Sequence, residues 1–532
     1  MHTILLTTLN ARYAHTALGL RYLYANLHEF QSETKIIEFT MNEQIQSIAE
    51  DLLKHSPKII GIGVYIWNAA QSAELIQTLK KVSPQTIIVL GGPEAGYLPH
   101  RVDFSKADYI ISGEGEVAFY ELCKKLLIKN DDGAKPHSST LTLSSLRQSA
   151  HAQFAALEIP QTQSNIPHFI KAPLPDLKAL SLPYTAFNDE DVEHRYIYVE
   201  ASRGCPFECE FCLSSIDEKV RNFPLDQLLE EFETLWQRGA RSFKFIDRTF
   251  NLNMSFANRI LDFFLSKEPP YFAHFEVIPD HFPDVLKAKI AQFPTGSLQL
   301  EIGIQTLDPI IAKGINRPLK VEKIFDNLRF LENETSAHMH LDLIVGLPGE
   351  SIEGFGRNLD TLVSLTHSEI QIGILKNLSG TTLSRHDQAH GMIYSDTPPY
   401  DILQNNLLSF EQIQKMKRFA RFWDIFYNSG SFTKTVPLIW SEGSVFEGFY
   451  AFSEWIYTQT LSTWKISLDR QITLIHTYLC EHHDKEIVEA ALVEDLATRP
   501  EKTIPFFLRQ STIEKKEKET KAVTPKRQAK RV

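Results

Sequence analysis

The chain has 532 residues, of which 43% are hydrophobic and 23% charged, an ordinary globular composition that predicts about three or four domains. Its net charge of -11 argues against a broad nucleic-acid surface, because nonspecific affinity for phosphates comes from many Lys and Arg contacts. No apolar run approaches the roughly 20 residues that span a bilayer, and residues 1–9 lack the basic start of a signal peptide. We therefore expect a protein of the reducing cytoplasm that does not bind membranes.

Residues 1–128 alternate short apolar strands with amphipathic helices. The expected strands are 2–9, 35–39, 59–67, 86–90 and 109–112, and the expected helices are 16–30, 69–82 and 116–128. This alternation predicts an α/β domain, a doubly wound parallel sheet with helices on both faces. Ligands of such sheets bind at the carboxyl ends of the strands, where the Gly91-Gly92-Pro93-Glu94 and Gly113-Glu114-Gly115-Glu116 segments fall.

A linker and three further segments follow this domain. Residues 129–194 are rich in Ser, Gln, His and Pro and are expected to form the linker. Residues 195–398 repeat a strand–helix unit six times, with strands expected at 196–202, 242–247, 272–277, 298–304, 338–345 and 369–375. Six such units predict a partial (β/α)6 barrel with its reaction residues at the carboxyl ends of the strands. Residues 399–510 are predicted to be helical and to cap the barrel mouth. The basic segment 511–532 is predicted to be a disordered, solvated tail, or alternatively a docking arm for RNA or an acidic partner.

Three of the five cysteines, Cys205, Cys209 and Cys212, form a Cys-x3-Cys-x2-Cys loop directly after the first barrel strand. Three thiolates bind soft iron, yet they leave one iron of a four-iron cluster without a protein ligand. Zinc would need a fourth ligand, and the nearest histidine, His194, lies eleven residues upstream beyond a predicted strand. A disulfide is disfavoured by the odd number of cysteines and by the lack of a secretory signal.

This spacing, with an aromatic residue immediately before Cys212, closely resembles that of the radical S-adenosylmethionine (SAM) superfamily. The resemblance implies a 4Fe-4S cluster whose open iron chelates the amine and carboxylate of SAM. It also implies reductive cleavage of the sulfonium to a 5'-deoxyadenosyl radical, with an electron donor such as a flavodoxin or ferredoxin. A noncatalytic iron–sulfur redox sensor built on the same three cysteines is the alternative from another functional class.

The N-terminal region resembles the cobalamin-binding domain that precedes the radical domain in a large subgroup of these proteins. The segment from Asn10 to His15, the Gly91-Gly92 pair and the Gly113-Glu114 pair are similar to that subgroup's loops. The Asp-x-His-x-x-Gly signature, whose histidine ligates cobalt in many cobalamin proteins, is absent. His15 thus stays open as a cobalt ligand, a cofactor-pocket residue or a packing residue, and the Gly91-Gly92 pair as plain turn glycines. An N-terminal sheet that has lost cobalamin is a further alternative.

The same resemblance implies SAM-binding roles at the ends of three barrel strands. Asp247 would pair with the SAM ammonium, although an ion pair with Arg248 or a strand-end cap is also open. On the fourth strand Glu301, Gly303 and Gln305 share one face. Glu301 would accept from the SAM ribose, unless it belongs to a buried structural network.

The fifth strand carries a motif that, by resemblance, lies beside adenine. Its Gly346 would permit close packing, whereas Glu350 is explained equally well as the start of the next helix. His338 and His340 share a face of this strand, and a core position is the commoner outcome for such residues.

The predicted pair of cofactors indicates an enzyme that abstracts a substrate hydrogen and then transfers a methyl group from cobalamin to an unactivated carbon. Relatives also perform cyclisations and ring contractions, so a methyltransferase and a cyclase both stay open. Cys123 and Cys480 have no cysteine neighbours, and the lack of a second cluster motif disfavours sulfur insertion. The substrate, small or macromolecular, is not specified by fold and cofactors.

Overall fold

The computed structural model of the chain describes residues 2–128, 167–217, 219–441, 443–497 and 508. The chain divides into two compact units. The first comprises 1–202, 221–240 and 396–399, and the second comprises 203–220, 241–395 and 400–532. Within the described residues, no helix is long and apolar enough to cross a membrane.

The first unit is built on a six-stranded sheet of order β2-β1-β3-β4-β5-β6, in which every neighbouring pair is parallel. Its strands are β1 (Ile4–Asn10), β2 (Thr34–Thr40), β3 (Ile59–Gly63), β4 (Ile87–Gly91), β5 (Tyr109–Ser112) and β6 (His168–Lys171). Every residue of β1 is buried, as expected for a strand covered on both faces. β6 comes from the segment that the sequence predicts as linker, and it extends the sheet by pairing with β5.

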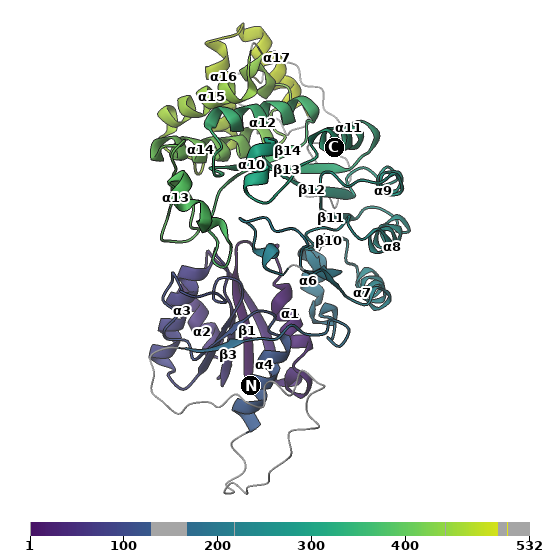
Figure 1. Cartoon of the computed structure of the whole chain (residues 1–532), viewed down its shortest axis with the longest axis vertical. Coiled ribbons are helices and arrows are strands. Elements are labelled where there is room, and N and C mark those ends of the chain that lie inside the picture. Colours follow the sequence, from purple (N-terminus) through teal and green to yellow (C-terminus); the bar gives the residue numbers. More distant parts are fainter. Residues whose placement is uncertain (1, 129–166, 218, 442, 498–507, 509–532) are drawn as a thin grey trace, which may run out of the picture. The chain divides into compact units, whose positions relative to one another are not determined.

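Helices cover both faces of this sheet (Figure 1). One hydrophobic cluster joins the sheet to α2 (Ile45–Leu53) and α3 (Ala69–Val82), and a second joins the other face to α1 (Leu18–Ala25) and α4 (Glu116–Ile128). The doubly wound prediction is therefore confirmed, although the sequence predicts no helix where α2 lies. The helix expected over 16–30 ends early and is followed by the 3-10 helix η1 (His28–Glu33).

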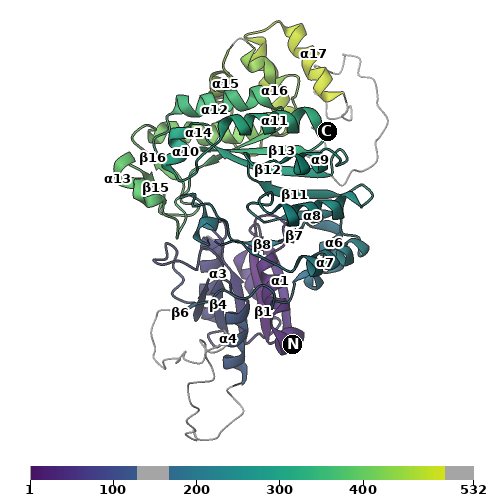
Figure 2. The same cartoon turned by 45° about the vertical axis from the view of Figure 1, so that its right-hand side comes forward.

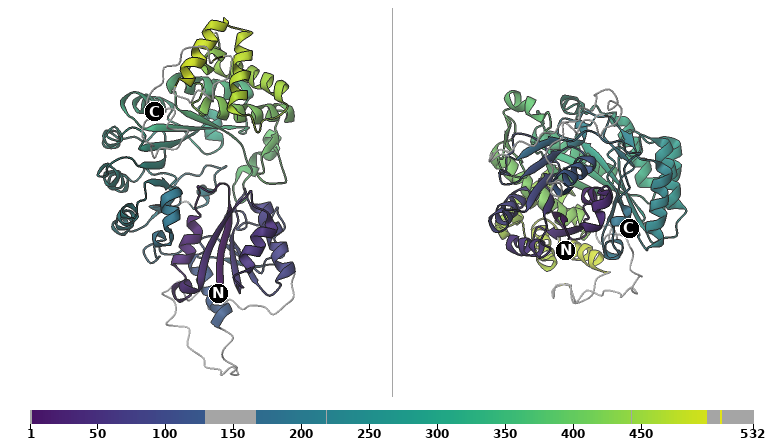
Figure 3. Two further views of the ribbon diagram at one scale, coloured as in Figure 1. Left: turned by 180° about the vertical axis from the view of Figure 1, so that it is seen from behind. Right: turned by 90° about the horizontal axis from the view of Figure 1, so that it is seen from below.

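A second six-stranded sheet has the order β14-β13-β12-β11-β10-β7, as predicted for a partial barrel. Its strands are β7 (Ile197–Val199), β10 (Ser242–Phe245), β11 (Phe272–Val277), β12 (Leu298–Gln305), β13 (His338–Val345) and β14 (Glu369–Ile374). The helices that follow are α7 (Leu225–Gln237), α8 (Met254–Leu265), α9 (Asp284–Ile290), α10 (Pro309–Gly314), α11 (Val321–Glu334) and α12 (Ile352–Leu365). Helices α8 and α9 lie outside the strands of the second unit (Figures 1 and 3).

The C-terminal region is helical, as predicted, with α14 (Phe410–Trp423), the π-helix η5 (Asp424–Asn428), α15 (Val445–Thr460), α16 (Leu468–Cys480) and α17 (Lys485–Leu496). The Asn428 side chain satisfies the edge of the sheet, since it accepts from Ile370 N and donates to Ile370 O, both at 2.9 Å. Gly356 on α12 admits Phe446 of α15, because a Cβ there would lie 2.6 Å from the Phe446 ring. These contacts place the helices beside β14 (Figure 1) and α12 (Figure 2), whereas the sequence analysis expected them over the barrel mouth.

The segment that links the barrel to the C-terminal helices adjoins the carboxyl end of β13. It contains η4 (Leu383–His386), α13 (Asp387–His390), β15 (Ile393–Tyr394) and β16 (Ile402–Gln404). Gly346 and Gly349 both have positive φ, and a Cβ on them would lie 2.8 Å from Ile402 and 3.2 Å from Ile311, with His390 at 3.3 Å. Gly346 is thus required by the packing of the chain itself.

Candidate active site

The cysteine loop begins with a glycine that no other residue could replace without strain. Gly204 has φ +91°, and a Cβ there would lie 2.4 Å from Lys219 O. The loop then closes on itself: Cys205 N donates to Asp217 O at 2.9 Å, and Cys212 N donates to Cys209 O at 3.1 Å. Cys205 and Cys209 are buried and Cys212 is half-buried. The backbone therefore holds three reduced sulfurs within one short turn.

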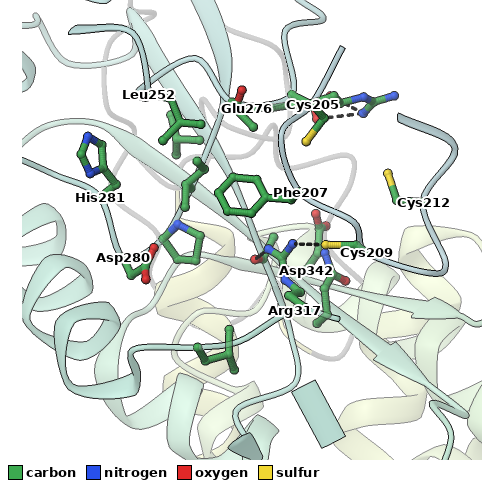
Figure 4. Close-up of a pocket in the computed structure, with 18 of the residues that line it drawn as sticks. Cys205, Phe207, Cys209, Cys212, Leu252, Glu276, Asp280, His281, Arg317 and Asp342 are labelled. Carbon is green, nitrogen blue, oxygen red and sulfur yellow. Dashed lines mark hydrogen bonds and ion pairs between the residues drawn. The ribbon is translucent and has the colours of Figure 1, made fainter. Parts of the chain in front are cut away.

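The three cysteines line a cavity of about 610 Å³ at the carboxyl ends of β10 to β13 (Figure 4). Glu301, Gly303 and Gln305 of β12 line it too, so these predicted residues meet the cysteines. The remaining charged or polar lining residues are Arg248, Thr249, Glu276, Asp280, His281, Arg317, Lys320 and Asp342. Asp247 and Gly346 are not among the residues that line it, and Asp247 is 4% exposed.

Arg317 is a cavity residue that the sequence prediction missed. Its Nη1 donates to Cys209 Sγ at 3.4 Å and its Nη2 donates to Gly303 O. Its Nε is buried and has no hydrogen-bond partner within the described residues. A guanidinium with a spare donor at the cavity wall can receive a ligand carboxylate. No motif spacing marks this arginine, because it reaches Cys209 from 108 residues away in the sequence.

A bulge in β12 shapes the wall that Arg317 contacts. The register with β13 shifts between Gly303 and Gln305, and Gln305 adopts a left-handed φ of +69°. A Cβ on Gly303 would lie 2.7 Å from Gln305 Nε2 and 3.3 Å from Arg317 Nη2. Glycine at 303 thus leaves room beside the strand for the Gln305 amide and the Arg317 guanidinium.

Two carboxyl groups on neighbouring strands have pKa values shifted in opposite directions. Glu301 Oε2 lies 2.8 Å from His274 Nε2, and although burial opposes ionisation, His274 and Lys244 hold the pKa of Glu301 below its usual range. Asp342 lies across from Gly303 on β13, and burial together with the charges of Glu301 and Glu276 raises its pKa well above the ordinary value. Its Oδ1 is buried and has no partner within the described chain. Burial thus favours the protonated form of Asp342, which lines the cavity and has a polar atom without a partner in the described chain.

The other acids predicted or weighed near the site have partners in the chain. Arg248, the alternative partner of Asp247, instead donates from Nη1 to both oxygens of Glu276 at 2.8 Å. Glu350 accepts from Thr306 and Asn358 at 2.6 and 2.9 Å, a structural role for a residue expected to start a helix.

The two histidines of β13 lie deeper in the barrel than the cavity. His338 is 8% exposed and lies 3.3 Å from Glu369, and His340 Nδ1 lies 3.4 Å from Gln299. Neither lines the cavity, which agrees with the core position that the sequence favoured. They form the layers of side chains below Asp342 on the same face of the strand.

In the first unit, the residues predicted to bind cobalamin already have intrachain partners. Asn10 Nδ2 donates to His15 O and Glu38 Oε1 at 3.0 Å each, and His15 Nδ1 lies 2.6 Å from the Tyr198 hydroxyl. Glu114 is paired with Arg221.

Backbone conformation and packing within the chain account for some of the glycines predicted at this edge of the sheet. Gly92 has φ +99°, and a Cβ there would lie 2.4 Å from Val64 O, whereas Gly113 has φ +92° with room to Ala172 O at 3.5 Å. Gly91 ends β4 and is not crowded, because its nearest neighbour would lie 3.9 Å away. Gly92 is therefore explained by close approach of its own backbone to the residue after β3.

An aromatic pair that the sequence did not single out lies just after β3. Tyr65 and Trp67 stack with ring centroids 4.5 Å apart and planes 5° apart. Trp67 is 45% exposed, and its Nε1 donates to Leu9 O near the end of β1. Asn68 fixes this corner by donating to Thr8, Leu9 and Gly63. A flat apolar surface is thus held at the carboxyl edge of the sheet.

No group of three His, Cys, Asp or Glu side chains among the described residues is arranged to hold a single metal ion. A four-iron cluster offers a separate iron to each of three thiolates, which suits the loop of Cys205, Cys209 and Cys212.

Three family models match successive parts of the chain. The B12 binding domain model matches residues 4–123, and the radical SAM superfamily model matches residues 199–362. The model of a protein family of unknown function, DUF4080, matches residues 388–532.

Individual relatives are distant. The chain is 23% identical over 423 residues to the uncharacterised methyltransferase PH0819 of Pyrococcus horikoshii, covering 76% of this chain and 86% of that protein. It is 24% identical to the cobalamin-dependent radical SAM methyltransferase TokK of Streptomyces tokunonensis, over 65% of this chain but only 50% of that protein.

Solved structures share the fold. The cobalamin-dependent SAM radical enzyme OxsB aligns over 93% of this chain and 79% of its own, with a TM-score of 0.58 and 16% identity. The radical SAM methyltransferase TsrM of Kitasatospora setae aligns over 75% of this chain and 82% of its own, with a TM-score of 0.54 and 16% identity.

Proposed function

Because the chain is a radical SAM protein with an N-terminal B12-binding domain, we propose that it methylates an unactivated carbon of its substrate. The observation that carries this proposal is the convergence of Cys205, Cys209 and Cys212 with Arg317 and Asp342 on one cavity. Methyl transfer is favoured over a ring contraction or cyclisation because PH0819 and TokK are both named as methyltransferases. The electron would come from a one-electron donor such as a flavodoxin or ferredoxin.

The cysteine loop fits a 4Fe-4S cluster with one open iron. It offers three sulfurs, and burial raises the pKa of the Cys205 thiol, so iron has to displace a proton there. The guanidinium of Arg317 beside Cys209 offsets negative charge on the thiolates. When bound, the cluster supplies the electron that cleaves the sulfonium of SAM.

The rest of the cavity fits the polar groups of SAM. Arg317 is assigned to the SAM carboxylate, because its Nε still lacks a partner in the described structure. Glu301, whose pKa is lowered, can accept from hydroxyl groups, whereas Asp342, whose pKa burial raises, can donate to them when it is protonated. Glu276 and Glu301 line the cavity in which the SAM ammonium would lie. Asp247 does not line the cavity and remains a proposed partner of the ammonium.

The first sheet fits cobalamin through shape more than through charge. Trp67 would give the corrin ring an apolar surface, and the turns at Gly91-Gly92 and Gly113 would let it approach the backbone. Asn10 and His15 hold the segment after β1 in place through their intrachain bonds, and Glu114 pairs with Arg221 beside the Gly113 turn. Cobalamin supplies a carrier for the methyl group.

Anaerobic reconstitution tests the proposal. Wild-type protein supplied with iron, sulfide, cobalamin, a reductant and SAM should retain cobalamin and release 5'-deoxyadenosine. Cys209→Ala should abolish that release, whereas Cys480→Ala, a cysteine of α16 outside the cavity, should leave it unchanged. A cluster that never cleaves SAM would identify a redox sensor instead.

The acceptor requires a second experiment. Reconstituted protein is incubated with cell extract and SAM labelled in its methyl group, and labelled molecules are identified by mass spectrometry. Transfer of label that needs both cobalamin and Cys209 would establish methylation. Release of 5'-deoxyadenosine without transfer of label would point to a rearrangement.

A further inference from the structure

A buried carboxylate lies inside the cysteine loop and has no place in the motif. Glu210 falls between Cys209 and Cys212, and its side chain is 1% exposed. A carboxylate taken out of water is stable as an ion only when it is well paired and hydrogen-bonded. The partners of Glu210 therefore matter for the loop that carries the three thiols.

Two consecutive residues of η4 supply those partners. Arg385 donates from Nε to Glu210 Oε2 at 2.7 Å, and its Nη2 lies 2.5 Å from Oε1, a two-pronged ion pair. His386 Nε2 lies 2.6 Å from Oε2 of the same carboxylate. We call Glu210, Arg385 and His386 the Glu210 clamp.

The clamp also fixes the turn that carries Arg317. Arg385 Nη2 donates to Gly314 O at 3.0 Å, and Glu210 N donates to Ile315 O at 3.3 Å. Two residues further along, Arg317 reaches Cys209 Sγ. These polar contacts thus join the cysteine loop, the end of α10 and η4 around Cys209.

We propose that the Glu210 clamp is a positioning device that holds the cysteine loop and sets the reduction potential of the cluster. The proposal rests on the proposed function, since it assumes a cluster at these cysteines. The potential of an iron–sulfur cluster depends on the net charge and hydrogen bonds around its sulfurs. In the intact clamp the charge of Glu210 is balanced by Arg385, so the field at the cluster is small.

The clamp assigns a function to η4, the segment that leads into the C-terminal family region. Arg385 and His386 lie directly before residues 388–532, and His390 packs against the Gly349 turn after β13. The cluster loop is therefore held by residues far outside the cysteine motif and outside the matched radical SAM region. The C-terminal region would act on the cluster through η4, without contributing a ligand.

Variants that remove one charge at a time distinguish an electrostatic effect of the clamp on the cluster from simple structural support of the cysteine loop. Glu210→Gln leaves Arg385 uncompensated and should raise the potential, because a nearby cation stabilises the reduced cluster. Arg385→Gln leaves the carboxylate uncompensated and should lower the potential. The double variant should return toward the wild-type value. The matched control is Glu208→Gln, an exposed glutamate of the same loop, which should cause little shift because water screens its charge.

The measurement is a redox titration of the reconstituted full chain at pH 8, followed by electron paramagnetic resonance of the reduced cluster, with iron and sulfide contents determined for every variant. Wild-type protein that assembles no cluster contradicts the proposed function. A cluster in Glu210→Gln with the potential of Glu208→Gln overturns the clamp alone. If Glu210→Gln holds no iron, Arg385→Gln decides: a lowered potential supports the clamp, and an unchanged or raised one overturns it.

Discussion

The carboxyl ends of the two parallel sheets differ in what they leave unused. At the second sheet, Arg317 Nε and Asp342 Oδ1 are buried without partners in the described chain. At the first sheet, Asn10, His15 and Glu114 are engaged by the chain itself. Buried polar groups without partners are costly, so they mark the place where a ligand completes the structure. The second sheet is built to bind charge, whereas the first offers the exposed face of Trp67.

This difference matches the two proposed ligands. SAM is small and carries a carboxylate, an ammonium and a sulfonium, so ion pairs and hydrogen bonds can fix it. Cobalamin is large and has a flat ring, so apolar area and close backbone approach can hold it without charged side chains. If this contrast is right, removing a single charge in the barrel should greatly weaken SAM binding. Cobalamin binding to the first sheet should weaken mainly when apolar contact area is lost.

The largest effect is expected from Arg317→Gln. Hydrogen bonds to charged groups contribute about 1.5–3 kcal/mol, so the loss should weaken SAM binding roughly tenfold to a hundredfold. The variant should keep its cluster, because Arg317 is not a ligand. Equilibrium binding of SAM to the reconstituted, unreduced protein measures this directly.

The control for Arg317 is Arg329→Gln, an exposed arginine of α11 paired only at the surface with Asp326. It should leave SAM affinity unchanged. Equal affinity in the two variants would show that the unused donor of Arg317 does not receive the SAM carboxylate, and the contrast between the sheets would lose its main support.

The sequence predicted those parts of the site that depend on residues close to one another along the chain. The cysteine spacing, the shared face of Glu301, Gly303 and Gln305, and the strands β11, β13 and β5 follow from short-range pattern. Arg317 was missed because its role depends on a bulge and a turn that bring it back to Cys209.

Tertiary contacts also decide the features of the fold that pattern could not supply. The residues of β6 do not alternate strongly, and they become a strand because β5 presents an unpaired edge. The helical region lies beside β14 because Asn428 satisfies the backbone of that strand, a contact that no periodicity reveals. Residues 129–166, the first part of the predicted linker, and the whole predicted tail, residues 511–532, lie outside the described residues.

A smaller effect is expected at the first sheet from Trp67→Ala. Loss of an exposed aromatic face should cost about 1 kcal/mol of cobalamin affinity, roughly fivefold to tenfold. Cobalamin retained after gel filtration, measured by its visible absorbance, reports the change. Trp464→Ala removes a tryptophan of the C-terminal region that is 68% exposed and should retain cobalamin like the wild type. Retention by Trp67→Ala equal to that control would remove the aromatic surface from the proposed site.

The smallest effect is expected at Glu350 of the barrel domain, whose Oε1 accepts from Thr306 and Asn358 and whose Oε2 is buried without a partner among the described residues. Burial raises its pKa to about 7, from an ordinary value of 4.5. Between these pH values the folded chain keeps a proton that the unfolded chain has lost. Stability should therefore fall as the pH rises through that window, by roughly 3 kcal/mol at most.

Glu350→Gln cannot ionise, yet its amide oxygen can still accept from both partners. The variant should match the wild type in thermal midpoint at pH 5 and exceed it at pH 8, with SAM affinity unchanged. Glu353→Gln, an exposed neighbour on α12, should keep the wild-type dependence on pH. Glu350 does not line the cavity, so if Glu350→Gln weakened SAM binding as Arg317→Gln does, the assignment of the SAM site to the residues that line the cavity would be wrong.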